Sequence, residues 1–119
     1  MALPRPRDQH LLEHLVEHRI ALDVCLTSNV ALRVVSDLDH HPIRELVAAG
    51  VTVTINTDDP PMFGTDLNNE YAIAARLLEL DERGVTDLAL AAVDASFASS
   101  QTKVALRAAI SSYAAMPAP

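Results

Sequence analysis

The middle of the chain, residues 51–65, reads VTVTINTDDPPMFGT. Residues 51–56 alternate apolar with small polar side chains and are β-branched up to Asn56, so we predict a β-strand there. Its apolar side chains would pack against helices, while the threonines and Asn56 would line an interior or a cleft. If the extended geometry continues for two further residues, Asp58 joins the polar face.

Two adjacent carboxylates, Asp58 and Asp59, follow this strand and precede Pro60 and Pro61. The prolines stiffen the turn, and ligand sites of α/β folds lie at the carboxyl ends of strands. Adjacent carboxylates repel each other unless a cation or hydrogen-bond donors compensate, and aspartate is an acceptable zinc ligand. An ordinary turn is the alternative, because Asp before Pro commonly opens one. The residues alone leave both interpretations open.

Periodicity elsewhere predicts an α/β fold. The expected elements are a helix capped by Asp8, a strand over residues 20–26, a helix over 43–49 ended by Gly50, the strand over 51–56, a helix over 67–80, a helix over 86–95 capped by Thr86, and a last helix capped by Ser99 or Ser100 that reaches about Tyr113. Residues 57–65 are expected to be a loop, and Gly84 is expected to break the helix before it. This order is typical of parallel strands joined by helical crossovers. Two strands alone leave unpaired edges, so neighbouring strands are expected to be missing.

Composition limits the function classes. The chain has 119 residues, 50% of them hydrophobic, and a net charge of −7 with a single lysine, Lys103. Binding to nucleic acid or to an anionic membrane needs clustered basic residues, so neither partner is expected. No apolar run resembles a membrane span or a secretory signal, and the lone Cys25 suits a reducing compartment. We expect a cytoplasmic protein made of a single partial domain, with residues 1–7 irregular, 8–113 folded and 114–119 a flexible tail.

Several segments together resemble the adenosine deaminase family. They are CLTSN at residues 25–29, HPI at 41–43, VTINTDDPPMFGT at 53–65, the start of the following helix through Glu70 and Tyr71, and ASFA at 95–98. Their order and spacing also fit, and the resemblance covers roughly residues 8–113. The NTDDP core with its Phe-Gly extension is the most specific part, whereas any other segment alone would be weak.

The resemblance implies the C-terminal part of a (β/α)8 TIM barrel with one zinc ion. Residues 20–26 would be its seventh strand and 51–56 its eighth. Asp58 would be the zinc-ligating aspartate that also helps to orient the attacking water, and Asp59 would hydrogen-bond the purine ring. Asn56 and Thr57 would support both aspartates. The implied reaction is hydrolytic deamination of adenosine to inosine and ammonia, with adenine or aminodeoxyfutalosine as alternative substrates.

The chain also departs from the family pattern. The His-x-His pair, the third zinc histidine, the proton-handling glutamate and the Gly-His-Gly segment have no counterpart in it, and Leu26 stands where the family often has proline. An incomplete barrel cannot close, so we expect the isolated chain to be inactive, to expose apolar surface and to self-associate through sheet edges. The ligands that complete the zinc site would lie elsewhere.

The remaining metal-ligand residue types have simpler interpretations. His10, His14 and His18 share one helix face at a spacing that a metal tolerates, but they alternate with glutamates on a face expected to be solvated. His41 is expected to cap or pack against the following helix, and Cys25 to be a small buried residue.

Two other function classes stay open. A small acidic-pocket α/β binding module, similar to phosphoacceptor receiver domains, needs a lysine at a strand end, whereas Lys103 falls in a predicted helix. A non-catalytic remnant with an interaction or structural role would keep the same motifs as the enzyme.

Overall fold

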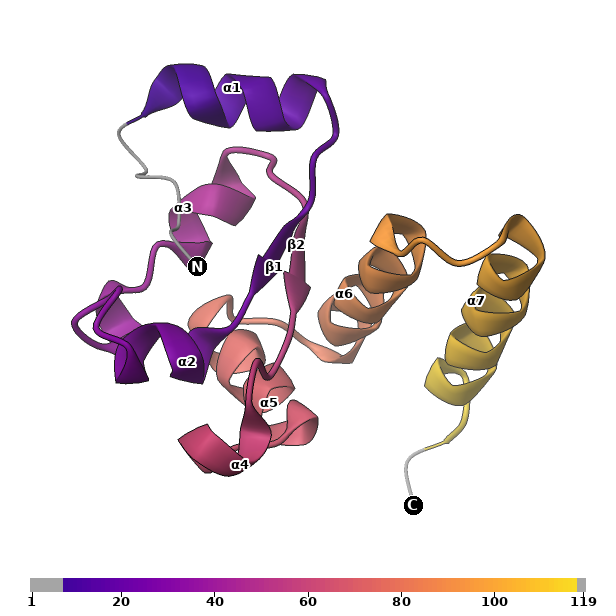
Figure 1. Ribbon diagram of the computed structural model, residues 1–119. Helices are drawn as coiled ribbons and strands as arrows, with labels where there is room; N and C mark the ends of the chain where they lie inside the picture. Colours follow the sequence, from indigo (N-terminus) through magenta and orange to yellow (C-terminus); the bar gives the residue numbers. More distant parts are fainter. Residues whose placement is uncertain (1–7, 118–119) are drawn as a thin grey trace.

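The computed structural model describes residues 8–117, and the predicted irregular start and the last two tail residues lie outside this range. The elements are α1 (Gln9–Glu17), β1 (Leu22–Val24), α2 (Leu26–Ala31), the 3-10 turn η1 (Leu38–His40), α3 (Ile43–Ala48), β2 (Val53–Ile55), α4 (Pro60–Phe63), α5 (Leu67–Leu77), α6 (Glu82–Ala95) and α7 (Ser100–Ala114). Figure 1 shows the two strands at the centre with helices around them. The predicted mixed α/β architecture is confirmed.

The two strands lie side by side and run parallel, as predicted. The register pairs Leu22 with Val53, Asp23 with Thr54, and Val24 with Ile55. Both strands are shorter than expected, and β1 ends at Val24 because α2 already begins at Leu26. Since the strands are parallel, their carboxyl ends meet at the same edge of the sheet, which brings the CLTSN and NTDDP segments together.

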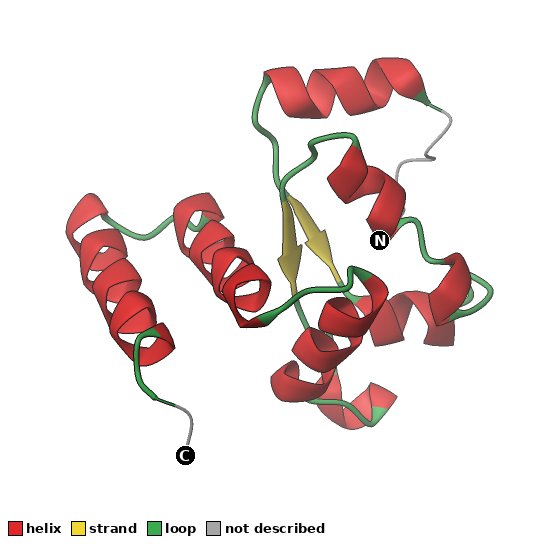
Figure 2. Cartoon of the chain, turned by 180° about the vertical axis from the view of Figure 1, so that it is seen from behind, coloured by secondary structure: helices red, strands yellow, loops and turns green. Residues whose placement is uncertain are grey.

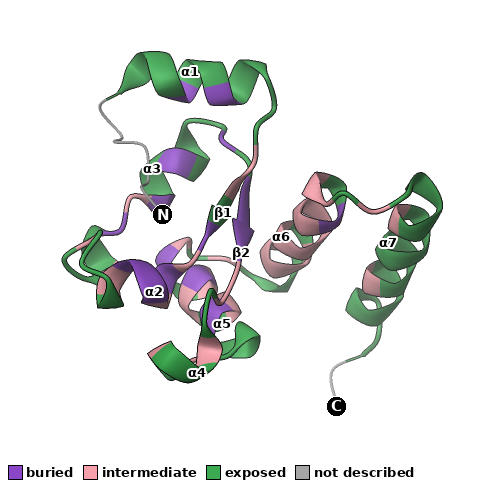
Figure 3. Ribbon diagram, viewed as in Figure 1, coloured by how far each residue is buried: buried purple, intermediate pink, exposed green. Residues whose placement is uncertain are grey.

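The core forms where the strands meet α1, α2, α3 and α5. Its buried members are Leu12, Leu15, Val24, Leu26, Ile43, Leu46, Val51, Val53, Ile55, Ala74 and Leu77. Figure 3 shows this buried material along the strands and on α2 and α5. Helix α6 packs against β2, and α7 packs against α6 without a buried residue of its own. In Figure 2, seen from behind, α7 is again separated from the sheet by α6.

Large apolar side chains are left exposed on the described part of the chain. They include Leu32, Val34, Val47, Phe97 and Val104. In residues 8–117 the sheet has only β1 and β2, so each strand keeps an edge without a further strand. Both observations agree with the expectation of an incomplete barrel. Within the same range, no helix combines the length and the apolar character that crossing a bilayer requires.

Two predictions about the helices after β2 were wrong. Gly84 does not break a helix but lies inside α6, which begins earlier because Asp81 caps it by accepting a hydrogen bond from the Gly84 amide at 2.8 Å. Thr86 is not a cap, since its hydroxyl donates to the carbonyl of Glu82. A Cβ at position 84 would lie 2.9 Å from the Leu80 side chain, so glycine permits this close contact. The stabilisation from a cap is comparable to the cost of about 1 kcal/mol for one helical glycine.

The expected loop over residues 57–65 contains the one-turn helix α4. The Asp59 carboxylate accepts from the Met62 amide at 3.3 Å, and Pro60 occupies the first helical position, where proline is tolerated. Gly64 ends the turn in the left-handed conformation, with φ of 62°. The cap and the glycine together explain why so short a segment becomes helical.

His41 joins α2 to the start of α3. The Ile43 amide donates to its Nδ1 at 3.1 Å, and its Nε2 lies 3.0 Å from Oδ1 of Asn29. Because the amide can only donate, Nδ1 carries no proton, and the ring is the neutral tautomer that donates from Nε2. Burial lowers the pKa of His41 from 6.5 to about 4. The expectation that His41 caps or packs against this helix is confirmed.

His41 should therefore make stability depend on pH. The unfolded chain takes up a proton near pH 6.5, whereas the folded chain resists it until about pH 4. The free energy of unfolding is thus fully supported above pH 6.5 and falls as the pH drops toward 4, by about 2–3 kcal/mol. Urea unfolding across this range measures the slope. His41→Asn should flatten it, and His10→Asn, on the exposed face of α1, should not. An unchanged slope in His41→Asn would contradict this assignment.

Candidate functional site

The site lies where the two parallel strands end. The hydroxyl of Ser28, which is 2% exposed at the start of α2, donates to Oδ2 of Asp58 at 2.7 Å. The two motifs are 30 residues apart in sequence and come into direct contact through this hydrogen bond. The carboxylate at position 58 is therefore fixed by the opposite strand end as well as by its own chain.

Asp58 does not continue the extended geometry of β2, so that part of the prediction was wrong. Its φ is 61°, in the left-handed region, which turns the chain sharply after Thr57. Aspartate is one of the few non-glycine residues that tolerate this conformation. The turn nevertheless leaves the carboxylate at the strand ends, where Ser28 reaches it, and the residue is exposed there.

Asp59 has a different environment from its neighbour. One of its oxygens caps α4, which is the turn-forming role that Asp before Pro commonly takes. The residue is exposed, and within residues 8–117 only Met62 is hydrogen-bonded to its side chain. A ligand can therefore approach the second oxygen without breaking the cap.

A polar ladder crosses the sheet on the face opposite the apolar side chains. The Thr54 hydroxyl donates to Asp23 at 2.6 Å and accepts from the Asn56 amide at 2.9 Å. Thr54 and Asn56 share one face, as the alternation predicted. Among the described contacts the Asn56 side chain is bonded to Thr54 and not to either aspartate of the turn, so Ser28, rather than Asn56, restrains Asp58.

Sequence reasoning missed Asp23 and Ser28 as members of this region. The alternation of residues 22–24 carried the signal for Asp23, which is in register with Thr54. The pKa of the half-buried Cys25 reflects the negative charge at these strand ends. Its pKa is raised by burial first and then by the carboxylates of Asp58, Glu70 and Asp23. Three negative groups thus converge near one thiol, which favours a cationic ligand there.

The Asp58 carboxylate has one oxygen available to a ligand. Asp58 uses one oxygen for Ser28, and no described residue is hydrogen-bonded to the other, so this carboxylate fits as one oriented ligand. No group of three His, Cys, Asp or Glu side chains in residues 8–117 is placed to hold an ion.

His10 and His14 of α1 and His18, which caps its C-terminal end, lie on the exposed side of the helix. The rings of His14 and His18 lie 4.2 Å apart, and Nδ1 of His18 is 3.0 Å from the carbonyl of His14. His10, His14 and His18 are exposed, and they are not among any metal-binding group in the described range. The predicted solvated polar face is confirmed.

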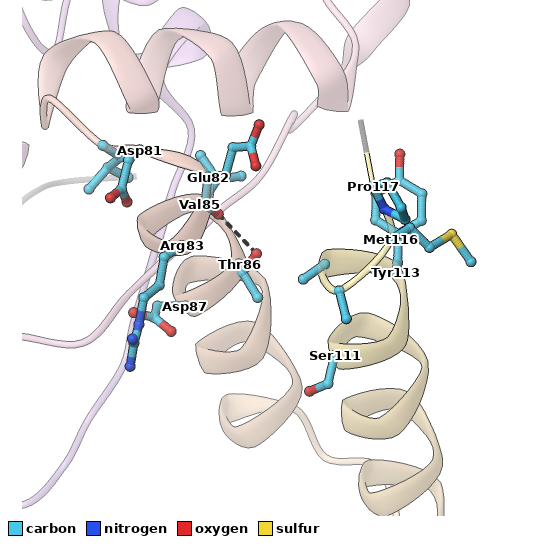
Figure 4. Close-up of a pocket in the computed structure, with 13 residues that line it drawn as sticks. Asp81, Glu82, Arg83, Val85, Thr86, Asp87, Ser111, Tyr113, Met116 and Pro117 are labelled. Carbon is cyan, nitrogen blue, oxygen red and sulfur yellow. Dashed lines mark hydrogen bonds between the residues drawn. The ribbon is translucent and has the colours of Figure 1, made fainter. Parts of the chain in front are cut away.

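The chain also has a surface hollow at a distance from the strand ends. It lies between the start of α6 and the end of α7, and Asp81, Thr86, Ser111 and Tyr113 are among its lining residues. Figure 4 shows these side chains on the two facing helices. Neither Asp58 nor Asp59 lines the hollow, so it is separate from the carboxylate site.

The left-handed turn at Asp58 can be tested by substitution. Asp58→Gly and Asp58→Ala both remove the acceptor for Ser28, so their difference isolates the backbone strain. We expect the Gly variant to be more stable than the Ala variant by about 1 kcal/mol, measured by urea unfolding. The matched pair at Asp87, exposed within α6, should show the opposite order, because glycine weakens a helix. The same order at both positions would contradict the geometry at Asp58.

Comparisons with known proteins identify the family of the chain. Residues 5–113 match the adenosine deaminase family. The chain is 62% identical over 109 residues to an aminodeoxyfutalosine deaminase of Streptomyces avermitilis, covering 92% of this chain and 30% of that protein. It is 40% identical over 103 residues to an adenine deaminase of Sinorhizobium fredii, covering 87% of this chain and 32% of that protein.

Solved structures show the same fold. An adenine deaminase of Arthrobacter aurescens superposes with a TM-score of 0.82 at 33% identity, over 89% of this chain and 32% of that chain. The Arabidopsis ADAL protein complexed with IMP superposes with a TM-score of 0.80 at 32% identity, over 94% and 38%. The chain spans about 30% of the length of the curated relatives described above. With its parallel strands, strand-end carboxylates and family match, the chain belongs to the adenosine deaminase family and folds as part of its TIM barrel.

Proposed function

We propose that this chain supplies the last two strand ends of the active site of a zinc-dependent deaminase that hydrolyses the exocyclic amine of an aminopurine. The observation that carries the proposal is the contact between Ser28 and Asp58, which presents an oriented carboxylate at the carboxyl edge of a parallel sheet. The region is negative and has no cationic side chain in ion-pair contact with Asp58 among the described residues, which suits a bound cation.

The roles of the two aspartates follow from their contacts. Asp58 would hold the metal through the oxygen that Ser28 leaves free and would orient the attacking water. Zinc, when bound, supplies a Lewis acid that makes water nucleophilic at neutral pH. Asp59 would accept a hydrogen bond from the purine ring through the oxygen not used by α4. The exocyclic amine then leaves as ammonia, and a carbonyl replaces it on the ring.

We also propose an order in which three candidate substrates should be tested. Relatives at 62% identity carry the name aminodeoxyfutalosine deaminase, which makes that nucleoside the first substrate to test. Adenine follows, because relatives at about 40% identity are adenine deaminases. Adenosine, the default of the sequence analysis, is the third. All three present the same 6-aminopurine to the strand-end carboxylates.

A non-catalytic remnant is the second candidate. The exposed apolar side chains and the open strand edges favour it for the chain alone, because the sheet is too small to enclose a substrate. We therefore also propose that residues 1–119 act as a partial domain that self-associates through these edges when it is made alone.

A fusion that completes the barrel tests the proposal. The chain would replace the matching 30% of the Streptomyces avermitilis relative. We expect about one zinc per fusion and ammonia release from at least one of the three substrates. The isolated chain should show neither bound zinc nor turnover.

Variants of the fusion separate the roles. Asp58→Ala should lower zinc affinity and turnover by more than about 100-fold, whereas Asp59→Asn should keep the zinc and lose turnover. Asp87→Asn, on the exposed face of α6, is the control and should match the parent fusion. Full zinc content and turnover in Asp58→Ala would refute the proposal, and so would an inactive parent fusion that folds.

A further inference from the structure

A buried glutamate next to the strand ends has no role in the reaction proposed above. Glu70, in the first turn of α5, is 0% exposed, and none of the ion pairs among the described residues includes it. Burying a carboxylate without a cation is unfavourable by several kcal/mol unless hydrogen bonds replace the lost water. Because Glu70 is fully buried, its hydrogen bonds must replace the water that its carboxylate has lost.

Three neutral donors surround the Glu70 carboxylate. The hydroxyls of Thr27 and Thr65 both donate to Oε1, the latter at 2.8 Å, and the Thr27 amide donates to Oε2 at 3.3 Å. The Thr65 hydroxyl itself accepts from the Asn69 side-chain amide at 2.9 Å, which orients it toward Glu70. The carboxylate thus bonds both the start of α2, 43 residues earlier, and the end of the loop after β2.

The bond to the Thr27 amide replaces a missing helix cap. The first amides of a helix have no partner within it, and the residue before α2, Cys25, makes no side-chain cap. Glu70 supplies the acceptor from another helix. The start of α2, which carries Ser28, is therefore held by α5, and α2 and α5 lie against each other in Figure 1.

Glu70 bonds two segments, the start of α2 and the loop after β2, and both lead to the contact between Ser28 and Asp58. Thr27 precedes Ser28 in α2, and Thr65 closes the loop that Asp58 opens. Each segment would be less restrained without Glu70. The start of α2 has no side-chain cap from Cys25, and Asp58 in the loop is in the left-handed region. A carboxylate with two acceptor oxygens can bond the start of α2 and the loop after β2 at the same time.

We propose that Glu70 is a positioning residue, whose carboxylate holds the start of α2 and the loop after β2 together so that the Ser28 hydroxyl reaches Asp58. This inference rests on the proposed function for its effect on metal binding. It does not rest on it for the geometry, which the hydrogen bonds of Glu70 give directly. Glu70 acts through Thr27 and Thr65 and does not touch the metal or the substrate.

The first test measures hydrogen exchange in the metal-free fusion, by mass spectrometry of the peptide that contains α2. Glu70→Gln offers only one acceptor oxygen, so it cannot accept from both the Thr27 amide and the two threonine hydroxyls, and exchange at the start of α2 should rise about tenfold. Asp81→Ala removes the cap of α6 and is the control, because it should destabilise the fold about as much as Glu70→Gln does. It should leave the hydrogen exchange of the α2 peptide unchanged. Equal exchange in Glu70→Gln and the parent would overturn the proposal.

The second test measures zinc affinity in the same fusion by competition with a chelator. Glu70→Gln and Ser28→Ala should each weaken it by about 10–100-fold, and the double variant should be no weaker than the weaker single one, because both act on one contact. Thr27→Ser, which keeps the hydroxyl, should bind zinc like the parent, whereas Thr27→Val should resemble Glu70→Gln. Additive losses, or a loss in Asp81→Ala as large as in Glu70→Gln, would mean that Glu70 serves only stability. If the parent fusion binds no zinc, the proposed function fails, and the exchange measurement still decides the role of Glu70.

Discussion

The hydrogen bond between Ser28 and Asp58 is the contact on which the site depends. It joins the ends of two parallel strands, and each partner needs support from a different part of the fold. Ser28 lies near the start of α2, where the Thr27 amide donates to Glu70. The residue after Ser28, Asn29, is hydrogen-bonded to His41. Asp58 is held by a left-handed turn that opens toward α4. The helices around the strands thus determine where one carboxylate lies.

Much of this arrangement could be predicted from the sequence. The β-branched alternation of residues 51–56 gave the direction and the polar face of β2, and Gly50 and Asp8 marked helix ends where the structure has them. These signals are local, because they depend on backbone preference and on side chains a few residues apart. The parallel pairing followed from the order of elements, and the family resemblance came from motifs that residues 25–29 and 53–65 carry.

The remaining features depend on contacts that a linear pattern does not encode. Alternation predicted an extended Asp58, but aspartate tolerates positive φ, and after the turn its carboxylate accepts from Ser28. Gly84 looked like a helix breaker because its lack of a side chain is visible in sequence, whereas its contact with Leu80 is not. Glu70 lies in the first turn of α5, and only the fold reveals that threonines from two other segments donate to its buried carboxylate.

The central claim is that Asp58 offers one oxygen to a metal while Ser28 keeps the other. A crystal structure of the completed barrel with zinc, located by its anomalous scattering, tests it most directly. The account predicts the ion about 2.0–2.2 Å from the free oxygen of Asp58, with the Ser28 bond intact. Zinc bound elsewhere, with the Asp58 carboxylate turned to bulk water, would contradict it.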